Sequence, residues 1–254
     1  MIGQTKLLNE LNNYTLETFP KASLFVGENG CGKHMVVDML STKFNRSVVN
    51  MADKLTYEKI VELFLETIPH IYIVDKELSD SEQNSLLKFI EEPPQNALVM
   101  ILTENENSLL ETIVGRCNIF KFDEYTKDEL RNFSNDESLI EYFKTPGELL
   151  NFNSDNSWVF NLCDVILTKL DSASIPNTLT LSLKFNFGKE ENKFDVLTFM
   201  KLLLKKCVEY NRNDSKYDNC YLTISKYLNK MKFPNANKQN LFELCLLDMK
   251  AALK

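Results

Sequence analysis

Short apolar segments alternate with amphipathic segments along the first half of the chain, and this alternation limits the fold more than any other feature of the sequence. The apolar segments have the length and composition of buried strands, whereas the segments between them carry apolar residues at helical spacing. The expected strands cover residues 22–27, 47–51, 70–75, 96–104 and 118–122, and the expected helices cover residues 33–44, 56–68, 79–94 and 108–115. The helix over 79–94 opens with Ser79 and Glu82, which have the spacing of a capping box. This alternation predicts an α/β fold in which helices cover both faces of a five-stranded parallel sheet.

The pattern changes after Phe122, where strand-like segments give way to helical ones. We expect two or three short helices first, and then longer amphipathic helices that are clearest over 193–210 and 238–253. The predicted organisation is an α/β domain over 1–122, a small helical domain over 123–153 and a helical domain over 154–254.

Charge, cysteine spacing and hydropathy narrow the class of function. A net charge of −7 argues against a protein whose main role is to grip a nucleic-acid backbone. The six cysteines include no CxxC pair, so we expect no metal site. The N-terminus is polar, without the apolar region of a signal peptide, and the longest aliphatic run, ALVMIL, is too short to span a membrane. These features predict a cytoplasmic protein without membrane contact.

The segment GENGCGK has the spacing of a phosphate-binding loop and lies between an expected strand and an expected helix. Gly27, Gly30 and Gly32 would let backbone N–H groups converge on phosphate oxygens, and Lys33 would reach the outer phosphates. The alternative is a glycine-rich turn between strand and helix without a ligand.

His34 follows the lysine, where a working loop carries a serine or threonine whose hydroxyl binds Mg²⁺. Magnesium demands oxygen ligands in tight octahedral geometry, and imidazole is a poor substitute. We therefore expect that no cofactor is required, and that ATP, ADP or phosphate binds at most weakly and without tightly coordinated Mg²⁺.

Asp75 ends the third expected strand and could support Mg²⁺ through water, or it could simply cap the strand. An ATPase of this architecture needs a carboxylate at the next residue to orient the attacking water. That residue is Lys76, which cannot act as this base, and Glu77 would point elsewhere.

The run LLKFIEEPPQNALVMILTENENSLLETIVGRC, residues 86–117, closely resembles the AAA+ clamp-loader subunits of bacterial DNA polymerase III. The N-terminal segment, including Gly3 and Gln4, is also similar to that family, and the resemblance covers roughly residues 2–122. Its strongest signals are EEPP, residues 91–94, and GRC, residues 115–117, where the family carries Ser-Arg-Cys. The resemblance implies an AAA+ P-loop domain, a small helical lid domain and an all-helical collar domain.

Within that family the sequence resembles the delta-prime type rather than the motor type. Motor subunits have an intact phosphate loop, an Asp-Glu pair after the third strand and an arginine in the lid that senses nucleotide. Here His34, Lys76 and Glu148 occupy those three positions. The four-cysteine zinc module that usual bacterial subunits carry between the loop and the third strand is also absent from the sequence.

The resemblance implies that Arg116 is an arginine finger that acts in trans on ATP bound to a neighbouring subunit. The implied partners are motor ATPase and delta-type subunits in a hetero-oligomeric ring, with the sliding clamp and primer-template DNA reached through the complex. Two alternatives stay open: a divergent but active ATPase of the motor type, and a nucleotide-sensing or DNA-binding module outside replication.

Aromatic residues in the last third of the chain could suggest a surface that stacks on nucleic-acid bases. Their helical spacing favours packing in a protein core instead. The residues concerned are Phe185, Phe194, Phe199, Tyr210 and Tyr227.

Overall fold

The computed structural model divides the chain into two compact units, Met1–Asn151 and Phe152–Lys254, which are described separately. The structure describes residues 3–51, 55, 60, 63, 68–94, 97–135, 137–152, 158–170, 172–177, 196–212, 214–231, 233 and 236–253. The predicted boundaries of three domains stay a prediction.

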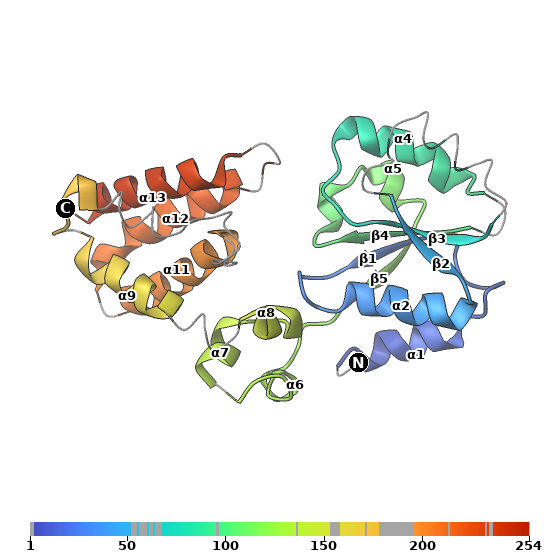
Figure 1. The fold of residues 1–254 in the computed structure, drawn as a ribbon, viewed down its shortest axis with the longest axis horizontal. Helices are drawn as coiled ribbons and strands as arrows, with labels where there is room; N and C mark the ends of the chain where they lie inside the picture. Colours follow the sequence, from blue (N-terminus) through green and yellow to red (C-terminus); the bar gives the residue numbers. More distant parts are fainter. Residues whose placement is uncertain are drawn as a thin grey trace. The chain divides into compact units, whose positions relative to one another are not determined.

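The first unit is built on a five-stranded sheet in the order β2-β3-β4-β1-β5, in which all neighbouring strands run parallel (Figure 1). The predicted parallel sheet is therefore confirmed. Its strands are β1 (Ala22–Val26), β2 (Ser47–Asn50), β3 (His70–Val74), β4 (Leu98–Thr103) and β5 (Asn118–Lys121).

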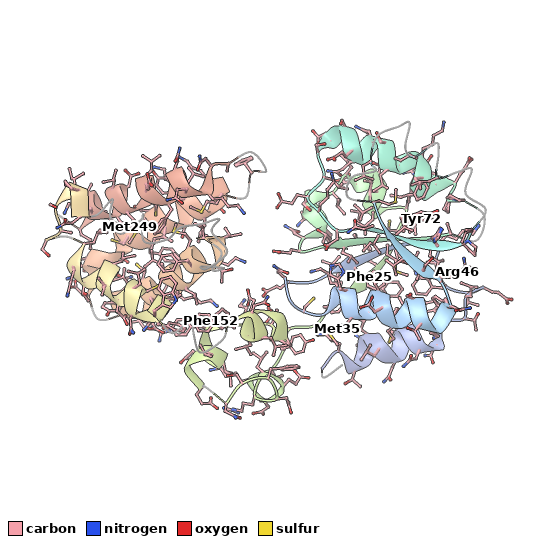
Figure 2. All side chains as sticks on the ribbon, in the orientation of Figure 1. Phe25, Met35, Arg46, Tyr72, Phe152 and Met249 are labelled. Carbon is pink, nitrogen blue, oxygen red and sulfur yellow. The ribbon has the colours of Figure 1, made fainter. Side chains whose placement is uncertain are left out.

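Helices cover both faces of this sheet, as the sequence predicts (Figure 1). Along β1, successive side chains point to opposite faces: Leu24 packs in the core beneath α4 (Asp80–Glu91), and Phe25 packs in the core beneath α1 (Thr5–Asn13) and α2 (Lys33–Phe44). Figure 2 labels Phe25 and Tyr72, which belong to these two separate cores.

Local sequence signals fix several helix ends in this unit. Helix α4 begins with the predicted capping box, in which Ser79 and Glu82 satisfy each other's backbone N–H groups. The helix predicted over 56–68 lies almost entirely outside the described residues. The helix predicted over 108–115 is shorter than expected: η1 covers Glu106–Ser108 and α5 covers Glu111–Val114. The reason is that Leu109 and Leu110 are extended, with ψ angles of 152° and 138°, and the Leu110 N–H bonds to the Gln83 side chain instead of to a helical carbonyl.

Three short helices follow β5 in the first unit, as the sequence predicts. They are α6 (Lys127–Leu130), α7 (Glu137–Tyr142) and α8 (Pro146–Asn151). A capping box between Thr126 and Glu129 starts α6. Proline is tolerated at the first position of α8 because that N–H would lack a helical partner in any case.

The second unit is helical in its described part. It contains α9 (Trp158–Lys169), α11 (Val196–Asn211), η3 (Ser215–Tyr217), α12 (Asp218–Met231) and α13 (Lys238–Ala252). Buried Lys250 donates from Nζ to the carbonyl of Leu170, 3.0 Å away, just beyond the end of α9. Such a contact satisfies a carbonyl that the helix itself leaves without a partner.

The predicted core packing is observed for two of the aromatic residues named from the sequence. Phe199 and Tyr227 are buried, and the Phe199 ring meets Phe242 edge-to-face. Tyr210 is partly buried and donates a hydrogen bond to Asp164. Phe185 and Phe194 lie outside the described residues. Among the helices that the structure describes, none has the length and apolar character required to cross a membrane.

Candidate functional site

The phosphate-loop sequence lies where a phosphate site belongs, between the carboxyl end of β1 and the first turn of α2. Gly30 and Gly32 have φ angles of 77° and 105°, a left-handed conformation that glycine adopts without steric cost. Gly32 is the residue that caps α2. The first N–H groups of a helix face outward without helical partners, so the loop keeps the geometry of an anion site.

Lys33 is nearly buried, with 9% of its surface exposed, and is directed at the loop itself. Its Nζ donates to the carbonyl oxygens of Gly27 at 2.6 Å and Glu28 at 3.1 Å. The lysine that would reach a phosphate is therefore held by two backbone carbonyls of its own chain.

The next three carbonyls of the loop accept hydrogen bonds from the segment that follows β5. Thr145 Oγ1 donates to Asn29, the backbone N–H of Gly147 donates to Gly30, and the Tyr125 hydroxyl donates to Cys31. The three distances are 2.7, 2.9 and 2.8 Å. Together with the Lys33 contacts, these bonds engage every carbonyl from Gly27 to Cys31.

Two glycines allow the loop and α8 to approach each other this closely. A Cβ atom on Gly147 would lie 2.5 Å from Gly30 Cα, and one on Gly30 would lie 2.9 Å from Gly147 Cα. Contacts this short do not occur between real atoms, so both positions require glycine for steric reasons. The loop backbone thus packs directly against the start of α8.

His34 and Asp75, the two residues at which the sequence pattern of a working phosphate loop would support Mg²⁺, contact each other. His34 is the second residue of α2, and Asp75 directly follows β3. His34 Nε2 and Asp75 Oδ2 are 2.6 Å apart, and both side chains are exposed to solvent, at 58% and 36%. The imidazole and the carboxylate thus satisfy each other, and the residues present do not fit a magnesium site.

Lys76 forms an ion pair with Glu82, which belongs to the capping box of α4. The hydrogen bond from Lys76, followed by those from the Ser79 N–H and hydroxyl, lowers the pKa of Glu82 from 4.5 to about 2. The residue that replaces a water-orienting carboxylate is therefore a cation whose charge is directed toward a helix N-terminus.

Glu148 lies in the first turn of α8, where its carboxylate interacts favourably with the helix dipole. Its Oε2 accepts a hydrogen bond from the Lys144 N–H at 3.2 Å. A negative side chain at this position cannot supply the positive charge with which a lid arginine contacts phosphate.

Arg116 lies at the amino ends of the parallel strands, and the phosphate loop lies at their carboxyl ends. In the β1–β5 pairing, Ser23 is opposite Asn118 and Val26 is opposite Lys121, so Arg116 precedes the amino end of β5 while Gly27 follows the carboxyl end of β1. Strands rise about 3.3 Å per residue, so the length of β5 alone separates the two ends by roughly 10 Å. The guanidinium and this chain's own loop therefore do not share a site.

Two contacts hold the Arg116 side chain. Its Nη1 donates to the Thr112 carbonyl at 2.9 Å, and its Nη2 lies 2.7 Å from Glu91 Oε1. The side chain is nevertheless 42% exposed. The next residue, Cys117, packs against the core with α4, and burial raises the pKa of its thiol to about 11.

Arg116 lies at the amino ends of the strands, whereas the residues predicted for the degenerate nucleotide site lie at the carboxyl ends: Gly27, Gly30, Gly32, Lys33, His34 and Asp75. Sequence reasoning missed the partners of these residues, above all Tyr125, Thr145 and Gly147. It noted Glu82 only as a helix cap. The Gly3-Gln4 pair was recognised by resemblance alone: the Gln4 side chain exchanges two hydrogen bonds with the Asp123 backbone, at 2.7 and 2.8 Å.

A pocket of about 110 Å³ lies beside the loop in the first unit. Three acidic residues line it, together with one lysine, and this balance of charge does not favour a phosphate group. Its lining consists of Glu28, Cys31, Phe122, Asp123, Glu124, Tyr125, Lys144 and Thr145. Within the described ranges, no group of three or more His, Cys, Asp or Glu residues is placed to hold a metal ion.

Comparison with known proteins gives matches in sequence and in fold. Residues 58–126 match the family described as DNA polymerase III, delta subunit. A segment of 67 residues is 34% identical to the DNA polymerase III subunit delta′ of Bacillus subtilis and covers 26% of this chain and 20% of that protein. A longer segment, 52% of this chain, is 24% identical to the DNA polymerase III subunit gamma of Buchnera aphidicola and covers 47% of it. The matches thus cover less than half the length of either relative.

The solved structures with a similar fold include two proteins of Thermotoga maritima. A DNA polymerase III gamma subunit-related protein of Thermotoga maritima aligns over 99% of this chain and 100% of its own, with a TM-score of 0.52 and 14% identity. A variant of Thermotoga maritima RuvB aligns over 84% of this chain and 79% of its own, with a TM-score of 0.51 and 17% identity. At these identities the likeness concerns the fold alone. The similarity to DNA polymerase III subunits therefore rests on the sequence of residues 58–126 and its neighbourhood, while the solved structures show the likeness in fold.

Proposed function

We propose that this chain is a clamp-loader subunit that does not hydrolyse ATP and that contributes Arg116 to an ATP site on a neighbouring subunit. The observation that carries the proposal is the 2.6 Å contact between His34 and Asp75. It joins the two positions that would hold Mg²⁺ in a working site, and it supplies neither a hydroxyl nor a free carboxylate.

The environment of Lys76 supports the same conclusion. Hydrolysis requires a group that orients the attacking water, and a lysine held by Glu82 has no acceptor to offer that water. Glu148 adds a negative charge near the loop, where charge on the phosphates would need to be neutralised. Metal binding, water activation and charge neutralisation are thus each unsupported by the residues present.

The hydrogen bonds of the phosphate loop favour a subunit that stays rigid within the assembly. All five carbonyls from Gly27 to Cys31 are engaged by Lys33 or by the segment after β5. All of the donors in this network belong to the chain itself. We therefore propose that the loop acts as an internal support for α8, and that nucleotide exchange does not move this part of the subunit.

Arg116 lies at the amino ends of the strands, whereas the loop of this chain lies at their carboxyl ends. The Arg116 side chain is also partly exposed, and both features suit action on another chain. A guanidinium presents a planar fork of N–H donors with fixed charge, and this geometry matches phosphate. The proposed partners are motor ATPase and delta-type subunits in a ring, which reaches the sliding clamp and primer-template DNA.

Steady-state phosphate release by the purified full chain tests the first half of the proposal. We expect no Mg²⁺-dependent activity above the level of a Lys33→Ala control, with or without primer-template DNA. Activity that requires Mg²⁺ and is lost in Lys33→Ala would instead identify the chain as a divergent motor subunit.

A further inference from the structure

The motif EEPP, residues 91–94, has no role in the proposed function, yet its first residue contacts the proposed finger. We infer that Glu91 is a positioning residue for Arg116: it holds the guanidinium in the orientation in which it meets the phosphate of a neighbouring subunit. This inference rests on the proposed function of Arg116 and adds a second residue to that site.

The contact between the two side chains is close and charged. Arg116 Nη2 lies 2.7 Å from Glu91 Oε1, while Nη1 donates to the Thr112 carbonyl at 2.9 Å. Two different nitrogens are thus held by two different elements, which fixes both the position and the plane of the guanidinium. The guanidinium has five N–H donors in all, so others are left for a ligand.

The backbones that carry the pair are themselves fixed relative to each other. Glu91 is the last residue of α4, and Arg116 follows α5 in a turn closed by its N–H bond to the Ile113 carbonyl. Nearly buried Gln83 joins the two elements: its Oε1 accepts from the Leu110 N–H at 2.7 Å, and its Nε2 donates to the Ser108 carbonyl at 3.3 Å.

The hydrophobic core reinforces this arrangement. Phe89 and Ile90, immediately before Glu91, are buried in the same cluster as Ile113, and Cys117 packs against it. A surface ion pair normally contributes little because two long side chains must be ordered. Here both backbones are fixed in advance, so only the two side chains remain to be ordered.

The pair is also open to another chain, because Arg116 and Glu91 are 42% and 44% exposed. A free arginine on the surface samples many rotamers, and a misplaced group lowers the rate of a reaction that depends on orientation. A carboxylate anchor restricts that sampling, because a charge-assisted hydrogen bond is about twice as strong as a neutral one.

The test uses the clamp-loader complex reconstituted from this chain and the other subunits of its host, with ATP and primer-template DNA. Glu91→Gln keeps the size of the side chain and removes its charge. The matched control is Glu92→Gln, because Glu92 is the adjacent exposed glutamate and, within the described part of the chain, the ion pair of Arg116 is with Glu91 instead. We expect Glu91→Gln to lower the kcat of DNA-stimulated hydrolysis roughly twofold to fivefold, the range of a partly exposed ion pair. We expect the KM for ATP to be unchanged, because the finger acts in the transition state.

A double variant separates positioning from other roles. If Glu91 acts through Arg116, Glu91→Gln should cause no further loss in an Arg116→Ala background. The inference is overturned if Glu91→Gln behaves like Glu92→Gln, if it raises the rate, or if it lowers the rate equally without Arg116. If the Arg116→Ala complex hydrolyses ATP at the unchanged rate, both the proposed function of Arg116 and the role of Glu91 are refuted. If Arg116→Ala lowers the rate and Glu91→Gln does not, only the role of Glu91 is refuted.

Discussion

At the scale of single residues, two substitutions at the candidate site have acquired partners within the chain. His34 meets Asp75, and Lys76 meets Glu82. Asp75 is the residue that would support Mg²⁺ in a working site, and Glu82 belongs to the capping box of α4. Each of the two unusual residues is therefore held by a contact with a nearby carboxylate. These two pairs show what His34 and Lys76 do in the folded chain.

The His34 contact leads to a prediction about magnesium. His34→Thr would restore a hydroxyl and release Asp75, so we expect Mg²⁺ to raise the affinity of this variant for ATP more than tenfold. In the native chain the increase should stay below tenfold, because no oxygen ligand replaces the imidazole. Calorimetry with and without Mg²⁺ measures both values, and Met35→Thr, at the exposed neighbouring position, serves as the control. A native chain whose affinity rises more than tenfold would refute the prediction.

The Glu82 carboxylate leads to a prediction about acid. Because its pKa is lowered in the folded chain from 4.5 to about 2, its stabilising effect is complete above pH 4.5 and is lost as the pH falls through about 2. At pH 7, Glu82→Gln should lower the free energy of unfolding by about 1 kcal/mol, the typical value of a helix cap. In urea titrations the difference from the native chain should shrink below pH 4.5. A difference that stays constant down to pH 2, or one equal to that of Glu92→Gln, would exclude this role.

At the scale of elements, the phosphate loop and the start of α8 behave as one structure. The Gly30–Gly147 approach and the hydrogen bonds from Thr145 and Tyr125 join segments far apart in sequence. A loop that elsewhere changes its contacts with nucleotide is here occupied by contacts within the chain. Under the proposed function, the stability of this site and its lack of response to nucleotide would have the same physical origin.

Replacement of Gly147 tests this joint. In Gly147→Ala the new Cβ would lie 2.5 Å from Gly30 Cα, which is backbone and cannot rotate away. We expect a loss of about 1–3 kcal/mol in the free energy of unfolding, as for other overpacked sites. Leu150→Ala, on the same helix but 64% exposed, should change it by less than about 0.5 kcal/mol. Urea denaturation measures both, and equal stability of the two variants would show that the joint contributes nothing.

At the scale of the whole molecule, the sequence predicts what depends on local pattern. Strand and helix periodicity gave the parallel sheet, and the Ser79–Glu82 spacing gave the start of α4. Contacts between distant segments could not be predicted: Asn29 and Thr145 are 116 residues apart, and no pattern in either segment points to the other. Arg116 illustrates the same limit, because its motif marked it as functional while its contact with Glu91 required the fold.

The central claim is that this chain contributes to ATP hydrolysis through Arg116 and not through its own loop. The most direct measurement is the DNA-stimulated ATPase rate of the reconstituted complex, compared between Arg116→Ala and Lys33→Ala versions of this subunit. The account predicts that Arg116→Ala assembles normally and lowers the rate, by up to about 10³-fold at the one site it serves, and that Lys33→Ala leaves the rate unchanged. A complex slowed by Lys33→Ala and unaffected by Arg116→Ala would contradict it.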